Sequence, residues 1–441
     1  MLVTPSRRPR GGLLRTSRLV ETVFPARLGT GFRWLVGSSW VTNLGDGMLI
    51  ASGPLLVASQ TRNPVLVSAA MLALTAPWLV VGLLAGALAD RLDRRVVMMV
   101  ANAVRGTVLA GLCVTIVTGD VNIAVVLVSM VALGTAETFV DATAGTLTPM
   151  LVDKRDLGIA NARLMTGMIT GNQLVGPAIG ALLFSAGMVW PFALTVVCIA
   201  VGVVLVSRIG TPPGAVRAEV DTHIRQDIAD GVRWLMGNPP VRTLAIIIVV
   251  FNVTWAAPWS VLVLWALERV GIDEAGFGLL TTASALGGLL ATSSYGRLER
   301  LVPLATLMRT VLLAEVLFHI AMALTTSAWA AYPLMFFFGA YAFVWGTLSQ
   351  AVRQRAVPSE LQGRVGSVYM ICVMGGMLAG SLIGGVIAQV WGLTAPWWFA
   401  FVGSGVTLAL VWRSLAQIAH ADEAAIGSAA EGVAEGRAPE S

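Results

Sequence analysis

Three acidic residues lie inside long apolar stretches of this sequence and are its best candidates for chemistry. Asp46 lies near the middle of the first stretch, and Glu137 and Asp141 lie four residues apart in the fourth. Residues four apart share one face of a helix. At the centre of a bilayer a charge costs at least about 2.5 kcal/mol, so carboxylates placed there indicate a function. A carboxylate can take up a proton on one side of a membrane and release it on the other. We therefore predict that Asp46, Glu137 and Asp141 are candidates for proton coupling.

The composition indicates that the whole chain is a membrane protein. Of its 441 residues, 56% are hydrophobic and only 12% are charged. A soluble protein this apolar could not cover its surface with polar groups, and runs of about 20 apolar residues are the signal of membrane-spanning helices. The net charge of +5 does not indicate nucleic-acid binding, because the basic residues lie in loops between the apolar stretches.

Twelve apolar stretches predict twelve transmembrane helices. The first six cover about 34–58, 65–89, 96–117, 121–146, 160–186 and 192–207, and the other six begin near 244, 276, 304, 330, 365 and 395. This pattern divides the chain into a basic cytoplasmic tail, a first half of six helices, a cytoplasmic linker with an amphipathic helix, a second half, and a disordered cytoplasmic tail. The predicted boundaries are 1–33, 34–208, 209–242, 243–415 and 416–441.

The distribution of arginine predicts the orientation of the chain. Basic residues concentrate in the even-numbered connections, and the odd-numbered ones hold little beyond Arg62 and Arg269. Cytoplasmic loops of membrane proteins carry the excess of basic residues. We therefore expect a multi-pass protein with both termini in the cytoplasm. Lys154 is the only lysine, and with abundant Ala, Gly and Val this suggests a GC-rich bacterial genome, so we expect the membrane to be a bacterial inner membrane.

Several short motifs recur about 205 residues later in the chain. Gly82-Leu-Leu-Ala recurs at Gly288, and Arg105 with its neighbours recurs at Arg309. An internal repeat of this length predicts two pseudo-symmetric halves of six helices each, with a transport site between them.

The connection between the second and third stretches carries the pattern G-x-L-A-D-R-x-x-R-R. Its members are Gly86, Leu88, Ala89, Asp90, Arg91, Arg94 and Arg95. The pattern resembles the loop between the second and third helices of major facilitator superfamily transporters. The usual pattern has Gly where this chain has Asp93, a departure that is common among the drug, macrolide and siderophore exporters of that superfamily. The resemblance covers roughly residues 30 to 415 and implies an all-α membrane protein with the major facilitator fold.

The fifth stretch carries Gly171, Gly176, Pro177 and Gly180. It resembles in part the exporter signature on this helix of major facilitator antiporters, although Asn172 stands where a Gly is usual. The other interpretation is ordinary packing, because small residues spaced along a helix let neighbouring helices approach closely.

The resemblance also implies that helices one, four, seven and ten surround the central cavity, so that the three candidate carboxylates face it. Candidates for the cavity lining are Asn43, Asn252, Trp255, Trp259, Trp345 and Gln350. Aromatic rings and a few amides suit a bulky amphiphilic compound. Arg105 and Glu315 lie on helices that are peripheral in the family, so for them we favour a structural role in which Arg105 pairs with one carboxylate. Many drug–proton antiporters carry an Arg in helix four, and this chain has none there.

These observations predict a secondary active transporter, not an enzyme, that exports an amphiphilic small molecule by proton antiport with alternating access. The expected cargo is a macrolide-like drug or other antibiotic, or a siderophore. The alternatives are an importer of a small metabolite, an uncoupled flippase of a lipid or intermediate, and a membrane-embedded enzyme, for which no motif is present. The expected partners are cargo, protons and membrane lipid, without nucleic acid, cofactor or metal, and the chain is expected to be a monomer.

Overall fold

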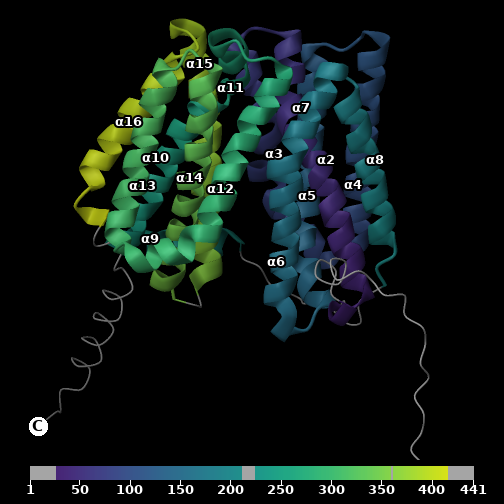
Figure 1. Cartoon of the computed structure of the whole chain (residues 1–441). Helices are drawn as coiled ribbons and strands as arrows, with labels where there is room; N and C mark the ends of the chain where they lie inside the picture. Colours follow the sequence, from purple (N-terminus) through teal and green to yellow (C-terminus); the bar gives the residue numbers. More distant parts are fainter. Residues whose placement is uncertain (1–25, 211–223, 359–360, 416–441) are drawn as a thin grey trace, which may run out of the picture.

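The computed structural model describes residues 26–210, 224–358 and 361–415. The predicted C-terminal tail and nearly all of the predicted N-terminal tail lie outside these residues, as do the side chains of Asp90 and Arg91. The described part of the chain is helical, and it begins and ends at the same end of the helical bundle (Figure 1). We call this end, where the linker helix lies, the lower end, and the opposite one the upper end.

The first half contains five uninterrupted long helices and one that is built from three segments. Short polar side chains set several of the helix starts, since Asn63, Asp93 and Asn122 each accept hydrogen bonds from backbone N–H groups of the first turn. The elements are η1 (Ala26–Leu28), α2 (Thr30–Gln60), α3 (Pro64–Arg91), α4 (Arg94–Thr118), α5 (Ile123–Leu151), η2 (Lys154–Asp156), the interrupted helix α6 (Leu157–Gly167), η3 (Met168–Val175) and α7 (Gly176–Ala186), and α8 (Trp190–Ser207).

The second half follows the linker helix and begins directly after it. The linker helix is α9 (Ile224–Gly237), and the elements of the second half are α10 (Pro239–Trp259), α11 (Leu262–Leu264), η4 (Trp265–Val270), α12 (Glu274–Leu301), α13 (Leu304–Leu324), α14 (Ala328–Ala356), α15 (Gln362–Trp391) and α16 (Ala395–Val411).

The predicted class of all-α membrane protein is confirmed. In the described residues, 11 helices are long and apolar enough to cross a membrane, and α16 is apolar but has only 17 residues. At about 1.5 Å per residue such a helix is slightly shorter than the hydrocarbon core of a bilayer. The predicted count of twelve therefore depends on α16. The first helix begins at Thr30, four residues before its predicted start, and α5 extends to Leu151, beyond the predicted 146.

The helices form two groups that correspond to the two halves. In the first group α2 packs against α7 and α8, and α3 and α4 pack against α5. In the second, α10 packs against α15 and α16, and α12 against α14. Between the groups, α3 packs against α15 and α7 against α12. These two pairs relate the second and fifth helices of one half to the fifth and second of the other, as a pseudo-two-fold axis requires.

The described contacts between the halves concentrate near the upper end. Arg62 and Glu268 form an ion pair of 3.4 Å across it, and the Thr282 hydroxyl donates a hydrogen bond of 3.3 Å to the Leu174 carbonyl. At the lower end the described ion pairs lie within one half or within the linker helix, or join the linker helix to the second half; examples are Arg27–Asp156, Arg355–Glu299 and Arg364–Asp230. The two groups of helices diverge toward that end (Figure 1).

Linker helix α9 packs on the lower end of the second half. Leu235 is buried, Gly231 lies against the backbone of Arg364, and Asp230 pairs with the Arg364 guanidinium at 3.4 Å. The linker is thus fastened to α15 by both packing and charge.

Candidate transport site

The interior of the first half contains an ion pair between two helices. The Arg105 guanidinium of α4 donates a hydrogen bond to the Asp46 carboxylate of α2 and another, of 3.2 Å, to the side-chain oxygen of Asn102. Arg105 is 2% exposed and Asp46 is 16% exposed. A guanidinium this deeply buried requires a carboxylate partner, because an unpaired charge would be far more costly. The pairing of Arg105 with one carboxylate is the structural role that the sequence suggested for it.

Glu137 and Asp141 of α5 complete the same cluster of charges. Both lie close enough to Arg105 for an electrostatic attraction, and both are repelled by Asp46. Among the described residues, neither the Glu137 carboxylate nor the Asp141 carboxylate forms an ion pair. Glu137 is half-buried, and Asp141, one turn nearer the lower end, is exposed. With all four groups ionised, three carboxylates face one guanidinium, which leaves two negative charges uncompensated inside the membrane-spanning region.

The position of the arginine differs from the pattern common among drug–proton antiporters. Those carry an arginine in the fourth helix, whereas here Arg105 reaches the cluster from the third helix, α4. The carboxylates therefore have a basic partner even though the fourth helix of this chain has no arginine. This relationship could not be read from the sequence, since it depends on how α2, α4 and α5 face one another.

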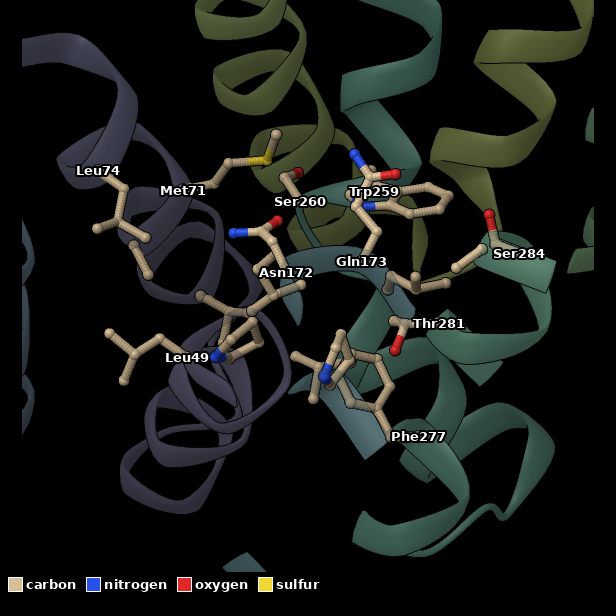
Figure 2. Close-up of a pocket in the computed structure, with 18 of the residues that line it drawn as sticks. Leu49, Met71, Leu74, Asn172, Gln173, Trp259, Ser260, Phe277, Thr281 and Ser284 are labelled. Carbon is tan, nitrogen blue, oxygen red and sulfur yellow. The ribbon is translucent and has the colours of Figure 1, made fainter. Parts of the chain in front are cut away.

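A cavity of about 390 Å³ lies between the halves in their upper part (Figure 2). Its walls come from α2, α3, α5 and the interrupted fifth helix on one side, and from α10, α11, α12 and α14 on the other. Figure 2 shows Asn172 and Gln173 near Trp259 and Ser260 of the opposite half. Most of the lining is apolar, so these few amides and hydroxyls could orient a bound molecule.

Asn172 and Gln173 are lining residues that sequence reasoning missed. They lie in η3, a π-helical segment of eight residues inside the fifth helix. A π-helix widens the turn and changes which side chains point to a given face, and such segments occur often at functional sites. Asn172 was visible in the sequence only as a departure from the exporter signature. The signal available was a polar residue where the family has glycine.

A larger cavity of about 700 Å³ lies lower, mainly against the second half. It contains four of the six predicted lining residues, which are Asn252, Trp255, Trp345 and Gln350. The fifth, Trp259, lines the upper cavity instead. Asn43 lines neither, and its side-chain amide donates a hydrogen bond of 2.8 Å to the Ser39 carbonyl of its own helix. Asp46, Glu137 and Asp141 do not line either cavity, so the structure separates the acidic cluster from the aromatic walls.

Glu315 also lines the lower cavity, which the sequence did not predict. It belongs to α13, the ninth long helix, which was expected to be peripheral. Its neighbours in the lining include Trp255, Phe338 and Tyr341.

The loop pattern of the first half lies at the lower end. Asp93 accepts a hydrogen bond from the backbone N–H of Arg95 and caps α4, which accounts for a residue that departs from the usual glycine. Arg94 donates hydrogen bonds to the Thr146 hydroxyl and the Met150 sulfur, both at 3.0 Å, and so ties α4 to α5. Among the described residues, no atom lies near enough to Gly86 to explain a glycine there. The side chains of Asp90 and Arg91 lie outside the described residues.

The glycines of the fifth helix lie where it crosses α2. A side chain at Gly176 would collide with the backbone of Gly47, and one at Gly180 with the backbone of Met48. The backbone of Pro177 packs against Gly278 of α12. Gly376, Gly380 and Gly384 of α15 lie against the backbone of α10 in the same way. Both motifs therefore permit close helix contact, and the antiporter role suggested for the first stays a prediction.

Comparison with known proteins gives one family and two exporters. Residues 22–432 match the family described as "Transmembrane secretion effector". The chain is 27% identical over 367 residues to the multidrug efflux pump Tap of Mycolicibacterium fortuitum, covering 80% of this chain and 87% of that protein. It is 25% identical over 386 residues to the enterobactin exporter EntS of Shigella boydii serotype 4, covering 86% and 87%.

Solved structures share the fold at low sequence identity. One is a bacterial homologue of the iron transporter ferroportin in an inward-facing state, with a TM-score of 0.71, 14% identity, and coverage of 88% of this chain and 98% of that chain. Another is a bacterial homologue of the lysosomal transporter Spinster, with a TM-score of 0.68, 12% identity, and coverage of 91% and 98%.

Proposed function

Because this chain belongs to the transmembrane secretion effector family of the major facilitator superfamily, we propose that it exports an amphiphilic small molecule by proton antiport with alternating access. The family and the two relatives establish a multi-pass membrane transporter of small molecules rather than an enzyme. The coupling to protons and the mechanism are our proposal. The observation that carries it is the surplus of carboxylates around Arg105.

The proposed proton carriers are Glu137 and Asp141. The positive charge of Arg105 compensates one carboxylate. This carboxylate is that of Asp46, which already forms an ion pair with Arg105. The two remaining negative charges are costly in the interior, and binding of one proton removes one of them. We propose that one of the two α5 carboxylates takes up a proton when the site faces outward and releases it when the site faces inward. A charge that crosses about 150 mV yields roughly 3.5 kcal/mol, enough for a gradient of a few hundredfold in a neutral cargo.

The proposed orientation places the lower end in the cytoplasm of a bacterial inner membrane. Arg94 and Arg95 lie at that end, together with Arg233 of α9, Arg353 and Arg355 in the last turns of α14, and Arg364 in the first turn of α15, and the cytoplasmic side carries the excess of arginine. In this orientation the contacts between the halves close the outer side, and the conformation is inward-facing. We propose that export proceeds as residues 34–208 and 243–415 rock about the sites between them.

The cargo is proposed to occupy the two cavities between the halves. Their apolar and aromatic walls with a few amides suit a bulky amphiphile. The names of the relatives supply two candidate classes, a drug and a siderophore. The loop pattern of Gly86, Asp90, Arg91, Arg94 and Arg95 is proposed to stabilise the conformational states, and the chain to act as a monomer.

An efflux panel tests this function. The chain would be expressed in an efflux-deficient bacterial host and challenged with macrolides, cationic dyes and a catecholate siderophore. We expect reduced accumulation of at least one compound, and we expect an uncoupler to abolish this effect because the proton gradient drives it. Increased uptake in expressing cells would favour an importer. Efflux that survives the uncoupler would favour an uncoupled flippase, and either result would overturn the proposal.

A further inference from the structure

A single carboxylate lies among the aromatic walls of the lower cavity. Glu315 is 7% exposed and lies in the membrane-spanning α13, yet it lines this cavity. An ionisable group inside a membrane helix is costly unless it has a partner or a function. What Glu315 contacts therefore decides whether it is structural.

Among the described residues, no arginine or lysine forms an ion pair with Glu315. His319 is the one basic residue that approaches it, with its Nε2 at 3.6 Å, and that ring is fully buried with no hydrogen bond on either nitrogen. The Tyr341 hydroxyl lies beside the carboxylate but outside good hydrogen-bond geometry. No arginine or lysine belongs to the described lining of the cavity. The carboxylate thus lacks the cation that Arg105 provides for Asp46.

Aromatic rings surround the space in front of this carboxylate. Trp255, Phe338 and Tyr341 line this space together with Glu315, and Trp255 packs against Trp259 of the upper cavity with ring centroids 5.1 Å apart. Phe251 and Trp345 pack with centroids 6.3 Å apart. Tryptophan and tyrosine faces attract a cation through their ring quadrupoles, most strongly where water is excluded. A cavity of aromatic faces with one uncompensated carboxylate is complementary to an organic cation.

We propose that the lower cavity binds the cationic amine of an amphiphilic cargo, with Glu315 as its counter-ion. This inference rests on the proposed export function and narrows it to one of the two candidate classes. An anionic catecholate siderophore would meet Glu315 without a compensating positive side chain, in a molecule whose acidic cluster already has surplus negative charge. Glu315 selects a cargo with a positive charge, and the aromatic rings select a bulky cargo.

Two isosteric ions and a neutral analogue test the site directly. Tetraphenylphosphonium and tetraphenylborate have nearly the same shape and opposite charge, and triphenylphosphine oxide is neutral. Binding of each would be measured by equilibrium dialysis to the full chain in nanodiscs, with empty nanodiscs subtracted. The variants are Glu315→Gln, Glu315→Asp and the control Glu299→Gln, which removes an exposed carboxylate of α12 that pairs with Arg355.

We expect the parent to prefer tetraphenylphosphonium to tetraphenylborate, and Glu315→Gln to lower its affinity for the phosphonium about tenfold or more, as expected for loss of a desolvated charge partner. Triphenylphosphine oxide should bind equally to the parent and to Glu315→Gln. The variants Glu315→Asp and Glu299→Gln should keep the preference for the cation. Equal phosphonium affinity in the parent and Glu315→Gln, or a preference for the borate, would overturn the inference while leaving export intact. Failure of the export function itself would appear separately, as a parent chain that lowers the accumulation of no compound in the efflux panel.

Discussion

The guanidinium of Arg105 on α4 pairs with the carboxylate of Asp46 on α2, inside the first half of the molecule. The pair fixes one carboxylate, and Glu137 and Asp141 are the proposed proton carriers. The acidic cluster is therefore asymmetric, with one structural carboxylate and two that lack an ion-pair partner among the described residues.

Replacement of Asp46 by Asn should abolish uphill efflux while leaving downhill movement of cargo. In the variant Arg105 loses its partner. The positive charge of Arg105 should then be compensated by Glu137 or Asp141, and this carboxylate would be held in the ionised form. Uncoupler-sensitive accumulation ratios in cells measure the uphill component, and dilution-driven efflux measures the downhill one. Asp153→Asn, in an exposed pair with Arg155, is the control and should pump like the parent. Uphill pumping by Asp46→Asn at the parent's rate would contradict this role.

Alanine at Gly176 should destabilise the protein, because its Cβ would collide with the backbone of Gly47 at the crossing of the fifth helix and α2. Overpacking of this kind costs about 1–3 kcal/mol. The matched control is Gly111→Ala on α4, where nothing lies within 4 Å of the added Cβ and where a helical Gly-to-Ala change should be neutral or stabilising. Thermal unfolding in detergent compares the two. Equal melting temperatures would mean that the close crossing does not require a glycine.

Cysteines introduced at Ser68 and Gly385 should form a disulfide that blocks export. A Cβ at Gly385 would lie 2.8 Å from the Cβ of Ser68, so a small shift of α3 against α15 gives disulfide distance. The background would lack the native cysteines Cys113, Cys198 and Cys372. Mild oxidation should lock the upper end closed and stop efflux, and a reductant should restore it. Full activity in the cross-linked protein would show that the upper end need not open.

Reporter fusions should locate both ends of the bundle. A reporter that is active only in the cytoplasm should be active when it is fused after Ser441. A reporter that is active only outside should be active when it is inserted between Arg269 and Asp273, because the arginine-rich loops lie at the lower end. Labelling of the C-terminus from outside intact cells would reverse the orientation and with it the direction of the proposed proton movement.

The helices could be predicted from the sequence because apolar length is a local property. The predicted start of the last helix at 395 is that of α16, and the other starts lie within a few residues of the structure. The repeat predicted two related halves, and the symmetric packing of α3 with α15 and of α7 with α12 in the structure agrees with that relation. These features depend on the hydrophobic pattern and on pseudo-symmetry, both of which can be recognised in the sequence.

The site was less predictable because it depends on which faces of distant helices meet. Glu315 was assigned to a peripheral helix, yet its side chain reaches the lower cavity. Asn172 and Gln173 reach the upper cavity through a π-helical segment, which no periodicity of 3.6 residues would reveal. The partner of Asp46 lies 59 residues away on a neighbouring helix, so only packing identifies it.

The central claim is that Glu137 and Asp141 couple export to the proton gradient. The direct measurement uses proteoliposomes with an imposed pH gradient and a compound identified by the efflux panel. The parent should accumulate the compound against its own gradient. A Glu137→Gln/Asp141→Asn double variant should fail to do so while still exchanging the compound at equilibrium without a pH gradient. Accumulation by the double variant equal to that of the parent would contradict the account.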